Sequence, residues 1–219
     1  MKFIGDVHGK YTQYQRIIDS CENSIQVGDM GVGFIRHEGP NAGTMISNPP
    51  HYAMVRGNHR FIRGNHDNPD VCKNHSQWIT DGKVEDDIMF VGGALSIDRD
   101  FRIEGYSWWA DEELSVNGLY VIVDQIAIYK PRIMVTHECP DQIADLLMNG
   151  SKFKDASRTR QAFSSAWEMH KPELWVFGHW HHDYDQVILG TRFICLNELS
   201  TIDIDLDDLS IGAIQPWIN

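Results

Sequence analysis

Short apolar runs that each end at a potential metal ligand dominate the pattern of this chain. Five runs end in Gly or Thr, and the residues that follow them are Asp6, Asp29, Asn65, His137 and His179. An apolar run of about four residues bounded by Gly is typical of a buried strand. Functional sites in open α/β sheets lie beyond the carboxyl ends of the strands. The pattern therefore predicts five strands whose ends bring metal-binding side chains into one crevice.

Segments with the apolar periodicity of a helix lie between several of these strands. Apolar residues recur every three to four positions over residues 10–21, which predicts an amphipathic helix and a βαβ start. Residues 119–126 fit a helix or a strand, because many of them are β-branched. The Gly-, Pro- and Asn-rich residues 31–50 predict a long loop beside Asp29, and long loops are often functional. The remaining predicted elements are a helical turn at 68–70, helices at 141–148 and 157–170, and strands at 88–91, 186–189, 191–196 and 202–206.

Length and composition are typical of one domain. The chain has 219 residues, 42% of them hydrophobic, and no repeat or linker, so residues 1–219 are predicted to form a single domain. It starts without a secretory signal and has no apolar run of about 18 residues, which predicts a cytoplasmic protein with no membrane contact, in the host cytoplasm if viral. Four scattered cysteines indicate reduced thiols, although Cys139 lies close enough to His137 to leave a thiolate ligand open.

The net charge of the chain helps to distinguish between possible binding partners. A formal net charge of −12, without a visible stripe of Lys and Arg, disfavours non-specific nucleic-acid binding. A compact phosphorylated substrate, attracted by a local metal charge, suits such a chain better than a long polyanion.

Five sequence blocks carry the most specific signal. They are Asp6-Val7-His8, Gly28-Asp29, Gly64-Asn65-His66-Asp67, Thr136-His137 and Gly178-His179-Trp180-His181. In this order and spacing the chain closely resembles the calcineurin-like metallophosphoesterase superfamily. The segment 92–113, which includes Trp108 and Trp109, is also similar to a subgroup found in bacteria and tailed bacteriophages.

The resemblance implies a four-layer αββα sandwich of the α/β class with a two-metal centre. One ion would be bound by Asp6, His8 and His181, the other by Asn65, His137 and His179, with Asp29 bridging both. A hydroxide that bridges the two ions would then attack a phosphomonoester or phosphodiester. Imidazole and carboxylate ligands suit Mn²⁺, which we favour, with Fe, Zn, Ni or Mg as alternatives, whereas a mostly nitrogen site is poor for Ca²⁺.

The resemblance also implies roles beside the metals. His66 would stabilise the developing charge or protonate the leaving oxygen, and Asp67 would orient its imidazole. Many phosphatases of the superfamily have Asp-Arg-Gly after the bridging Asp, whereas this chain continues Met30-Gly31. Arg63 is therefore predicted to bind phosphate, with Arg36 and Arg102 as weaker candidates.

The assignment within the third block has a competitor, because Arg56-Gly57-Asn58-His59 repeats the pattern of residues 63–66. We favour the second copy, since it follows a cleaner strand and alone continues into Asp67. This choice predicts that Asn65, and not Asn58, binds metal.

Other interpretations of the sequence stay open. A small nucleotide or phosphodiester is the first substrate hypothesis, a phosphoprotein the second, and a nuclease or a non-catalytic scaffold are rivals. Trp108 and Trp109 could stack a base or pack in the core, and His182 fits a surface position better than a ligand. Glu112 and Glu113 are predicted to begin a helix in solvent. The acidic run 203–208 fits a solvated strand face better than a calcium loop.

Overall fold

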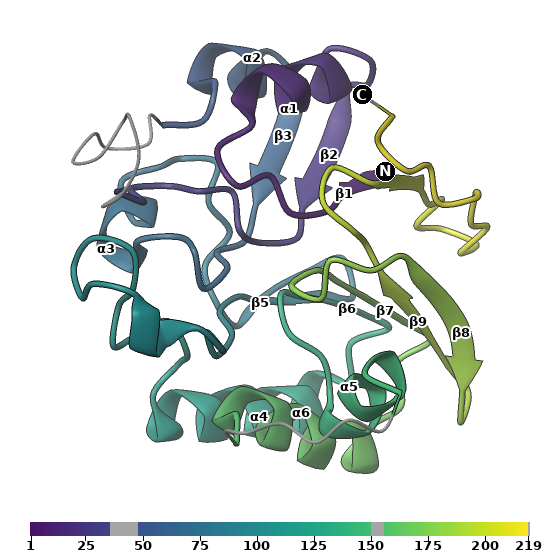
Figure 1. Ribbon diagram of the computed structural model, residues 1–219. Helices are drawn as coiled ribbons and strands as arrows, with labels where there is room; N and C mark the ends of the chain where they lie inside the picture. Colours follow the sequence, from purple (N-terminus) through teal and green to yellow (C-terminus); the bar gives the residue numbers. More distant parts are fainter. Residues whose placement is uncertain (36–47, 150–155, 219) are drawn as a thin grey trace.

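The computed structural model describes residues 1–35, 48–149 and 156–218, which form two β-sheets between two layers of helices (Figure 1). The smaller sheet has the strand order β10-β1-β2-β3. In it β1, β2 and β3 run parallel, and β10 pairs antiparallel with β1 at one edge. The bounds of these strands are β1 (Lys2–Ile4), β2 (Asn23–Gln26), β3 (Asn58–Phe61) and β10 (Thr201–Asp203).

The larger sheet has six strands in the order β4-β5-β6-β7-β9-β8. Its four central strands are parallel, and each edge strand pairs antiparallel with its neighbour. Its strands are β4 (Lys83–Glu85), β5 (Ile88–Val91), β6 (Ile133–Thr136), β7 (Leu174–Phe177), β8 (Tyr184–Ile188) and β9 (Thr191–Cys195).

Helices cover the outer face of each sheet (Figure 1). Next to the smaller sheet lie α1 (Tyr11–Ile18) and α2 (His51–Arg56), and next to the larger one α4 (Val116–Tyr129), α5 (Asp141–Leu147) and α6 (Arg158–Met169). The short α3 (Pro69–Cys72) and the 3₁₀ turn Arg99–Phe101 complete the helical elements of the described residues. This arrangement confirms the predicted four-layer αββα sandwich.

The layers form because successive side chains of a buried strand point to opposite faces of its sheet. Phe3 packs between the two sheets, while its neighbour Ile4 packs under α1. In β5, Phe90 likewise faces the space between the sheets and Met89 the helices of the larger sheet. Both faces of these strands are apolar, because side chains alternate with period two and each sheet is covered on both sides. One core contains residues of both sheets, and the single domain over residues 1–219 stays a prediction.

Several predicted elements differ in extent or burial. Residues 119–126 are helical and belong to α4, in which Ile122 and Ile126 pack against the larger sheet. β3 begins at Asn58 and ends at Phe61, earlier than the apolar run before Asn65 suggests. The predicted strand 202–206 is only three residues long as β10. Glu112 and Glu113 do not begin a helix in solvent: they are buried, and α4 starts later, after its N-cap Ser115.

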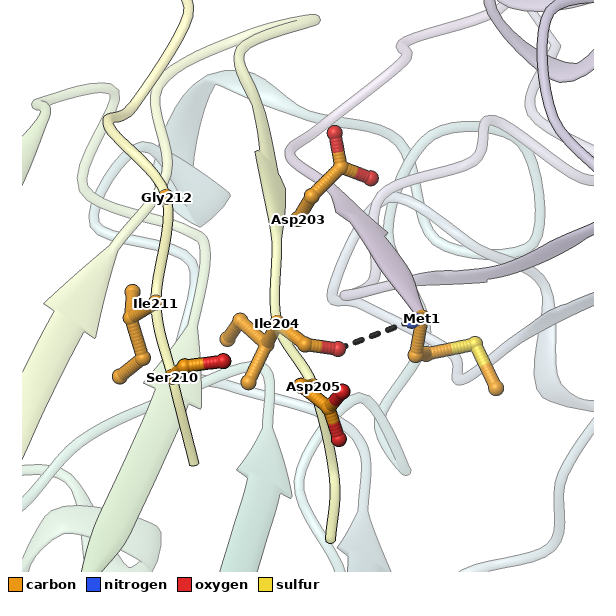
Figure 2. A pocket seen from close by; sticks show the side chains of 7 residues that line it. All are labelled: Met1, Asp203, Ile204, Asp205, Ser210, Ile211 and Gly212. Carbon is orange, nitrogen blue, oxygen red and sulfur yellow. Dashed lines mark hydrogen bonds between the residues drawn. The ribbon is translucent and has the colours of Figure 1, made fainter. Parts of the chain in front are cut away.

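The acidic C-terminal run borders an open pocket of about 460 Å³ at the edge of the smaller sheet (Figure 2). The amino group of Met1 donates a hydrogen bond to the Ile204 carbonyl there. Asp203 pairs with Lys2, and Asp205 accepts a hydrogen bond from the Asp207 N–H. These carboxylates have partners within the fold, and none of the metal-type groups found in the described residues includes them.

Two further predictions concern the long loop 31–50 and membrane-spanning helices. Residues 36–47 lie outside the described residues, so the predicted functional loop is described only at its ends, and Arg36 is not described. In the described ranges, no helix combines the length and the apolar character that crossing a membrane requires.

Candidate metal centre

The predicted ligands lie shortly after the ends of parallel strands of both sheets. Asp6 follows β1, Asp29 follows β2 and Asn65 follows β3, while His137 and His179 follow β6 and β7. Because the carboxyl ends of both sets of strands meet, residues far apart in sequence gather in one cluster. Asp6, Asp29, Asn65 and His137 are at most 2% exposed.

Two groups of side chains in this cluster match the two predicted ion positions. Asp6, His8 and His181 form the first, and Asp29, His137 and His179 the second; within each group the potential ligand atoms lie within 4.8 Å of one another. In the first group, Nε2 of His181 lies 3.2 Å from Asp6 Oδ2 and 2.9 Å from Nε2 of His8. Distances of this order would let one cation replace the direct contacts.

Asp29 and Asn65 link these groups. Asp29 Oδ1 lies 3.3 Å from His137 Nε2, and Oδ2 lies 3.8 Å from His8 Nε2, so the carboxylate faces both groups. Asn65 Oδ1 lies 3.0 Å from His137 Nε2, which adds the amide to the second group. All seven predicted metal ligands are therefore close together. Cys139, the alternative thiolate, belongs to none of the metal-type groups in the described part of the chain.

The charges of the cluster suit a cation. Burial opposes ionisation of Asp29, but the imidazoles of His137, His66 and His8 outweigh it and hold the pKa of the carboxyl well below its ordinary value. Burial likewise disfavours a charged His137, yet Asp29 raises its pKa to about 10. The negative field that draws a proton to His137 would also attract a divalent cation, and carboxylate, imidazole and amide are ligands that such ions accept.

Glycines precede several ligands because another ligand packs against their α-carbon. A methyl group at Gly28 would overlap the His137 ring, and one at Gly64 would overlap Oδ1 of Asp29. The same holds for Gly178 and Oδ1 of Asp6. The Gly-ligand pattern thus reflects close packing across the centre as well as strand termination.

The backbone at four of the ligands lies in the left-handed region. His8, Asp29, His179 and His181 have φ values of 48°, 56°, 69° and 47°. Such values are uncommon for residues other than Gly, and each costs of the order of 1–3 kcal/mol, so strained residues of this kind cluster at functional sites.

Buried polar groups outside the predicted set hold the second group in place. The Val27 carbonyl lies 2.8 Å from His137 Nδ1, which assigns the proton to Nδ1 and leaves Nε2 free to bind an ion. Asn65 Nδ2 donates to Ser96 Oγ, whose hydroxyl donates to Glu112. The sequence interpretation missed Ser96 and Glu112, although both lie in the segment 92–113 that it singled out.

Glu138 is another buried acid beside the centre that the sequence interpretation missed. Its Oε2 lies 3.7 Å from Nε2 of His179, and Oε1 accepts a hydrogen bond from the Trp180 indole. Arg160 lies 3.4 Å from the same carboxylate, which offsets part of the cost of burying it. The only sequence signal for Glu138 is its place directly after His137.

His66 is half-buried beside the cluster, between an arginine and an aromatic ring. Arg102 Nη2 lies 2.6 Å from His66 Nε2, and the Phe34 ring stacks on the imidazole at 5.3 Å. The His66 backbone N–H donates to Asp29 Oδ1 over 2.7 Å. Burial, helped by His8 and Arg102 and opposed by Asp29, lowers the pKa of His66 to about 4.

Asp67 contacts the backbone and not His66. Its carboxylate accepts hydrogen bonds from the N–H groups of Gly31, Val32 and Gly64, over 2.7 to 2.8 Å, and is fully buried. Asp67 therefore joins the loop after β2 to the loop after β3. Its predicted role in orienting His66 has no support in these contacts.

Arg63 is buried, which corrects its predicted role. Its Nε donates to Asp81 and its Nη1 to the carbonyls of Asp111 and Glu112, and the residue is 3% exposed. A guanidinium bound in this way joins the loop after β3 to the segment before α4. Of the predicted arginines within the described residues, Arg102 is the one that contacts His66.

The two similar Gly-Asn-His copies lie at opposite ends of β3. Asn58 begins the strand, paired with Asn23, and His59 Nδ1 lies 2.9 Å from Ser24 Oγ. Asn65 and His66 follow the end of the strand and lie in the cluster. Only the copy that follows the carboxyl end of β3 therefore lies in the cluster of predicted ligands.

The chain belongs to the calcineurin-like phosphoesterase family, whose sequence profile matches residues 2–183. Members of this family are hydrolases that act on phosphoester bonds and depend on divalent metal ions. The bacterial and bacteriophage subgroup stays a prediction. No curated protein sequence matches the chain.

Several solved structures match this chain at low sequence identity. A candidate 5′-nucleotidase from Staphylococcus aureus, in complex with α-ketoglutarate, matches with a TM-score of 0.53 and 12% identity over 98% of this chain and 52% of that protein. This chain thus spans about half the length of that protein. An archaeal phosphodiesterase matches with a TM-score of 0.45 and 11% identity, over 98% of this chain and all of the other. Phosphopantetheinyl hydrolase from Mycobacterium tuberculosis matches with a TM-score of 0.46 and 12% identity, over 90% of this chain and 89% of that protein.

Asn65→Ala is expected to remove one of two bound metal ions and most activity, whereas Asn58→Ala leaves both largely intact. Asn65 Oδ1 lies in the cluster, while Asn58 is exposed at the other end of β3. Metal content by elemental analysis and turnover of a chromogenic phosphoester would measure the difference. The opposite result would transfer the ligand assignment to the first copy.

Proposed function

We propose that this chain hydrolyses a small phosphomonoester or phosphodiester at a pair of divalent cations. Asp6, His8 and His181 would hold one ion, Asn65, His137 and His179 the other, and Asp29 both. The observation that carries the proposal is the convergence of two groups of potential ligands on either side of Asp29. Bound there, two cations would supply Lewis acidity and activate a water molecule for attack on phosphorus.

The metal that we favour is Mn²⁺. The centre mixes imidazole nitrogens with carboxylate and amide oxygens, and no thiolate takes part among the described residues. Such a mixed donor set suits Mn²⁺ and also accepts Fe, Zn, Ni or Mg. A cytoplasmic location stays a proposal from the sequence.

Arg102 and His66 would bind the phosphate beside the proposed metal ligands His8 and Asp29. Arg102 is already held by Asp98, with Nε 2.7 Å from Oδ1 and Nη2 2.7 Å from Oδ2, and its Nη2 reaches His66. The N–H groups of Arg102 that contact His66 would turn to the phosphate on binding, and the fixed plane of a guanidinium suits phosphate oxygens. We therefore propose Arg102 as the phosphate-binding arginine in place of Arg63.

The substrate class that we favour is a small nucleotide or phosphodiester. The net charge of −12 argues against long nucleic acids, as the sequence predicts. Trp109 is 8% exposed and lies 6.2 Å from the Phe34 ring, which favours packing beneath the site over direct base stacking. A phosphoprotein substrate stays the second candidate.

The test of this proposal is hydrolysis by purified protein of paired chromogenic mono- and diesters, after removal of metal by a chelator and again after addition of Mn²⁺. We expect activity only with Mn²⁺ present, and on at least one of the two substrates. Absence of hydrolysis of both, with Mn²⁺ bound, would favour the non-catalytic scaffold. Preferential cleavage of long single-stranded DNA would favour the nuclease.

A further inference from the structure

The two halves of the proposed centre differ in burial. Asn65 is 2% exposed and His137 is fully buried, while the side chain of His181 in the other half is 51% exposed. A buried ion position needs each ligand atom to point in the correct direction, because solvent cannot complete its coordination. For an asparagine this condition is demanding, since its oxygen and nitrogen have nearly the same shape.

A directed chain of hydrogen bonds reaches Asn65 from the side away from the centre. Asn65 Nδ2 donates to Ser96 Oγ over 2.9 Å, and the Ser96 hydroxyl donates to Glu112 Oε2 over 2.5 Å. The other oxygen of Glu112 accepts the backbone N–H of Ser96 over 2.9 Å. Ser96 and Glu112 are 1% and 2% exposed, so solvent does not compete for these groups.

The direction of this chain sets the orientation of the amide. A hydroxyl has a single hydrogen, and the Glu112 carboxylate takes that of Ser96. Only lone pairs of Ser96 then face Asn65, so the amide must turn its N–H group toward Ser96 and Oδ1 toward His137 Nε2. The opposite orientation would turn the amide NH2 group, instead of Oδ1, toward the bound cation and repel it.

We propose that Ser96 and Glu112 are positioning residues that present the Asn65 oxygen to the buried cation and thereby set the affinity of that position. The inference depends on the metal centre of the proposed function but not on its substrate. Partners that orient a metal ligand typically contribute 10- to 100-fold in metal affinity.

The neighbouring glutamate provides a matched control. Glu113 is also buried, at 4% exposure, and also accepts a serine hydroxyl and a backbone N–H, from Ser157 and Thr159. These partners belong to the start of α6 and do not contact the centre. Glu113→Gln therefore makes the same chemical change in a similar environment without reaching Asn65.

The experiment is calorimetric titration of metal-free protein with Mn²⁺ for wild type, Glu112→Gln, Ser96→Ala and Glu113→Gln. A glutamine at 112 that accepts the Ser96 N–H turns its own N–H group toward the hydroxyl, which reverses the direction of the chain. We expect Glu112→Gln and Ser96→Ala to weaken one of two Mn²⁺ positions by about 10- to 100-fold and to leave the other unchanged. Glu113→Gln should bind both ions as wild type does.

The thermal midpoint of each metal-free variant separates positioning from folding. Loss of stability in Glu112→Gln with both Mn²⁺ affinities unchanged would overturn the inference, as would an equal loss of affinity in Glu113→Gln. Two bound Mn²⁺ ions without phosphoester hydrolysis would refute the proposed function and leave this inference testable. The inference itself would fail if Glu112→Gln and Ser96→Ala kept wild-type Mn²⁺ affinities while the wild-type protein hydrolysed phosphoesters.

Discussion

Asp29→Asn is expected to weaken both metal positions by more than about 100-fold, the upper range for a residue that only orients a ligand, and to abolish phosphoester hydrolysis. The carboxylate faces His137 on one side and His8 on the other, and it is 1% exposed. Asparagine has the same shape but lacks the charge, so neither cation would have the shared anionic ligand. Thermal unfolding with and without Mn²⁺ measures the effect, because a ligand at 100 times its Kd stabilises the native state by about 2.7 kcal/mol.

The matched control is Asp203→Asn at the edge of the smaller sheet. Asp203 pairs with Lys2, and its side chain is 58% exposed. This variant should keep the Mn²⁺-induced rise in midpoint that Asp29→Asn loses. Wild-type binding of two Mn²⁺ ions by Asp29→Asn would contradict the shared-ligand assignment.

The convergence of the proposed ligands was predictable because it depends on strand ends. An apolar run that stops at a glycine indicates both the strand and the point where the chain leaves the sheet. Since the smaller and larger sheets place the ends of their parallel strands together, five such points meet around Asp29. The structure adds a second reason for the glycines, because Gly28, Gly64 and Gly178 each lie against another ligand.

The roles of Asp67 and Arg63 were not predictable from the same pattern. Both adjoin the cluster in sequence, yet Asp67 turns to backbone N–H groups of the loop after β2, and Arg63 to Asp81. A local motif specifies the residue types, but the direction of each side chain depends on distant partners. Arg102 was a weaker candidate because no motif marks it, and only the folded segment 92–113 brings it to His66.

Buried acids were the least predictable feature of the site. Glu112 and Glu138 are charged residues, which sequence patterns assign to solvent, since such residues are seldom fully buried unless paired. Both are buried here because hydrogen-bond donors surround them, from Ser96 at Glu112 and from the Trp180 indole at Glu138. Glu138 contacts the proposed ligand His179 directly, and Glu112 reaches the proposed ligand Asn65 through Ser96, so their positions depend on tertiary contacts that no local spacing encodes.

His66→Ala is expected to lower kcat by about 10²- to 10⁴-fold, the range typical of a positioned acid or base, and to leave two Mn²⁺ ions bound. The substitution removes the imidazole but keeps the backbone N–H that donates to Asp29 Oδ1. Metal content and steady-state kinetics on the same preparation measure both quantities. The geometry also allows a competing role, because His66 lies within 4.8 Å of His8 and Asp29 as a possible ligand; loss of a metal ion in His66→Ala would establish that role instead.

Arg102→Ala distinguishes phosphate binding from support of His66. If Arg102 binds phosphate directly, its removal should raise KM in the wild-type protein and also in the His66→Ala variant. If it acts only through its 2.6 Å contact with His66, the double variant should be no worse than His66→Ala, since the effects of residues that act through each other are not additive. Arg56→Ala serves as the charge control, because Arg56 ends α2 and its side chain is 74% exposed, and it should leave both constants unchanged. We expect the first pattern, because Asp98 already holds the Arg102 guanidinium in the plane that it would present to phosphate.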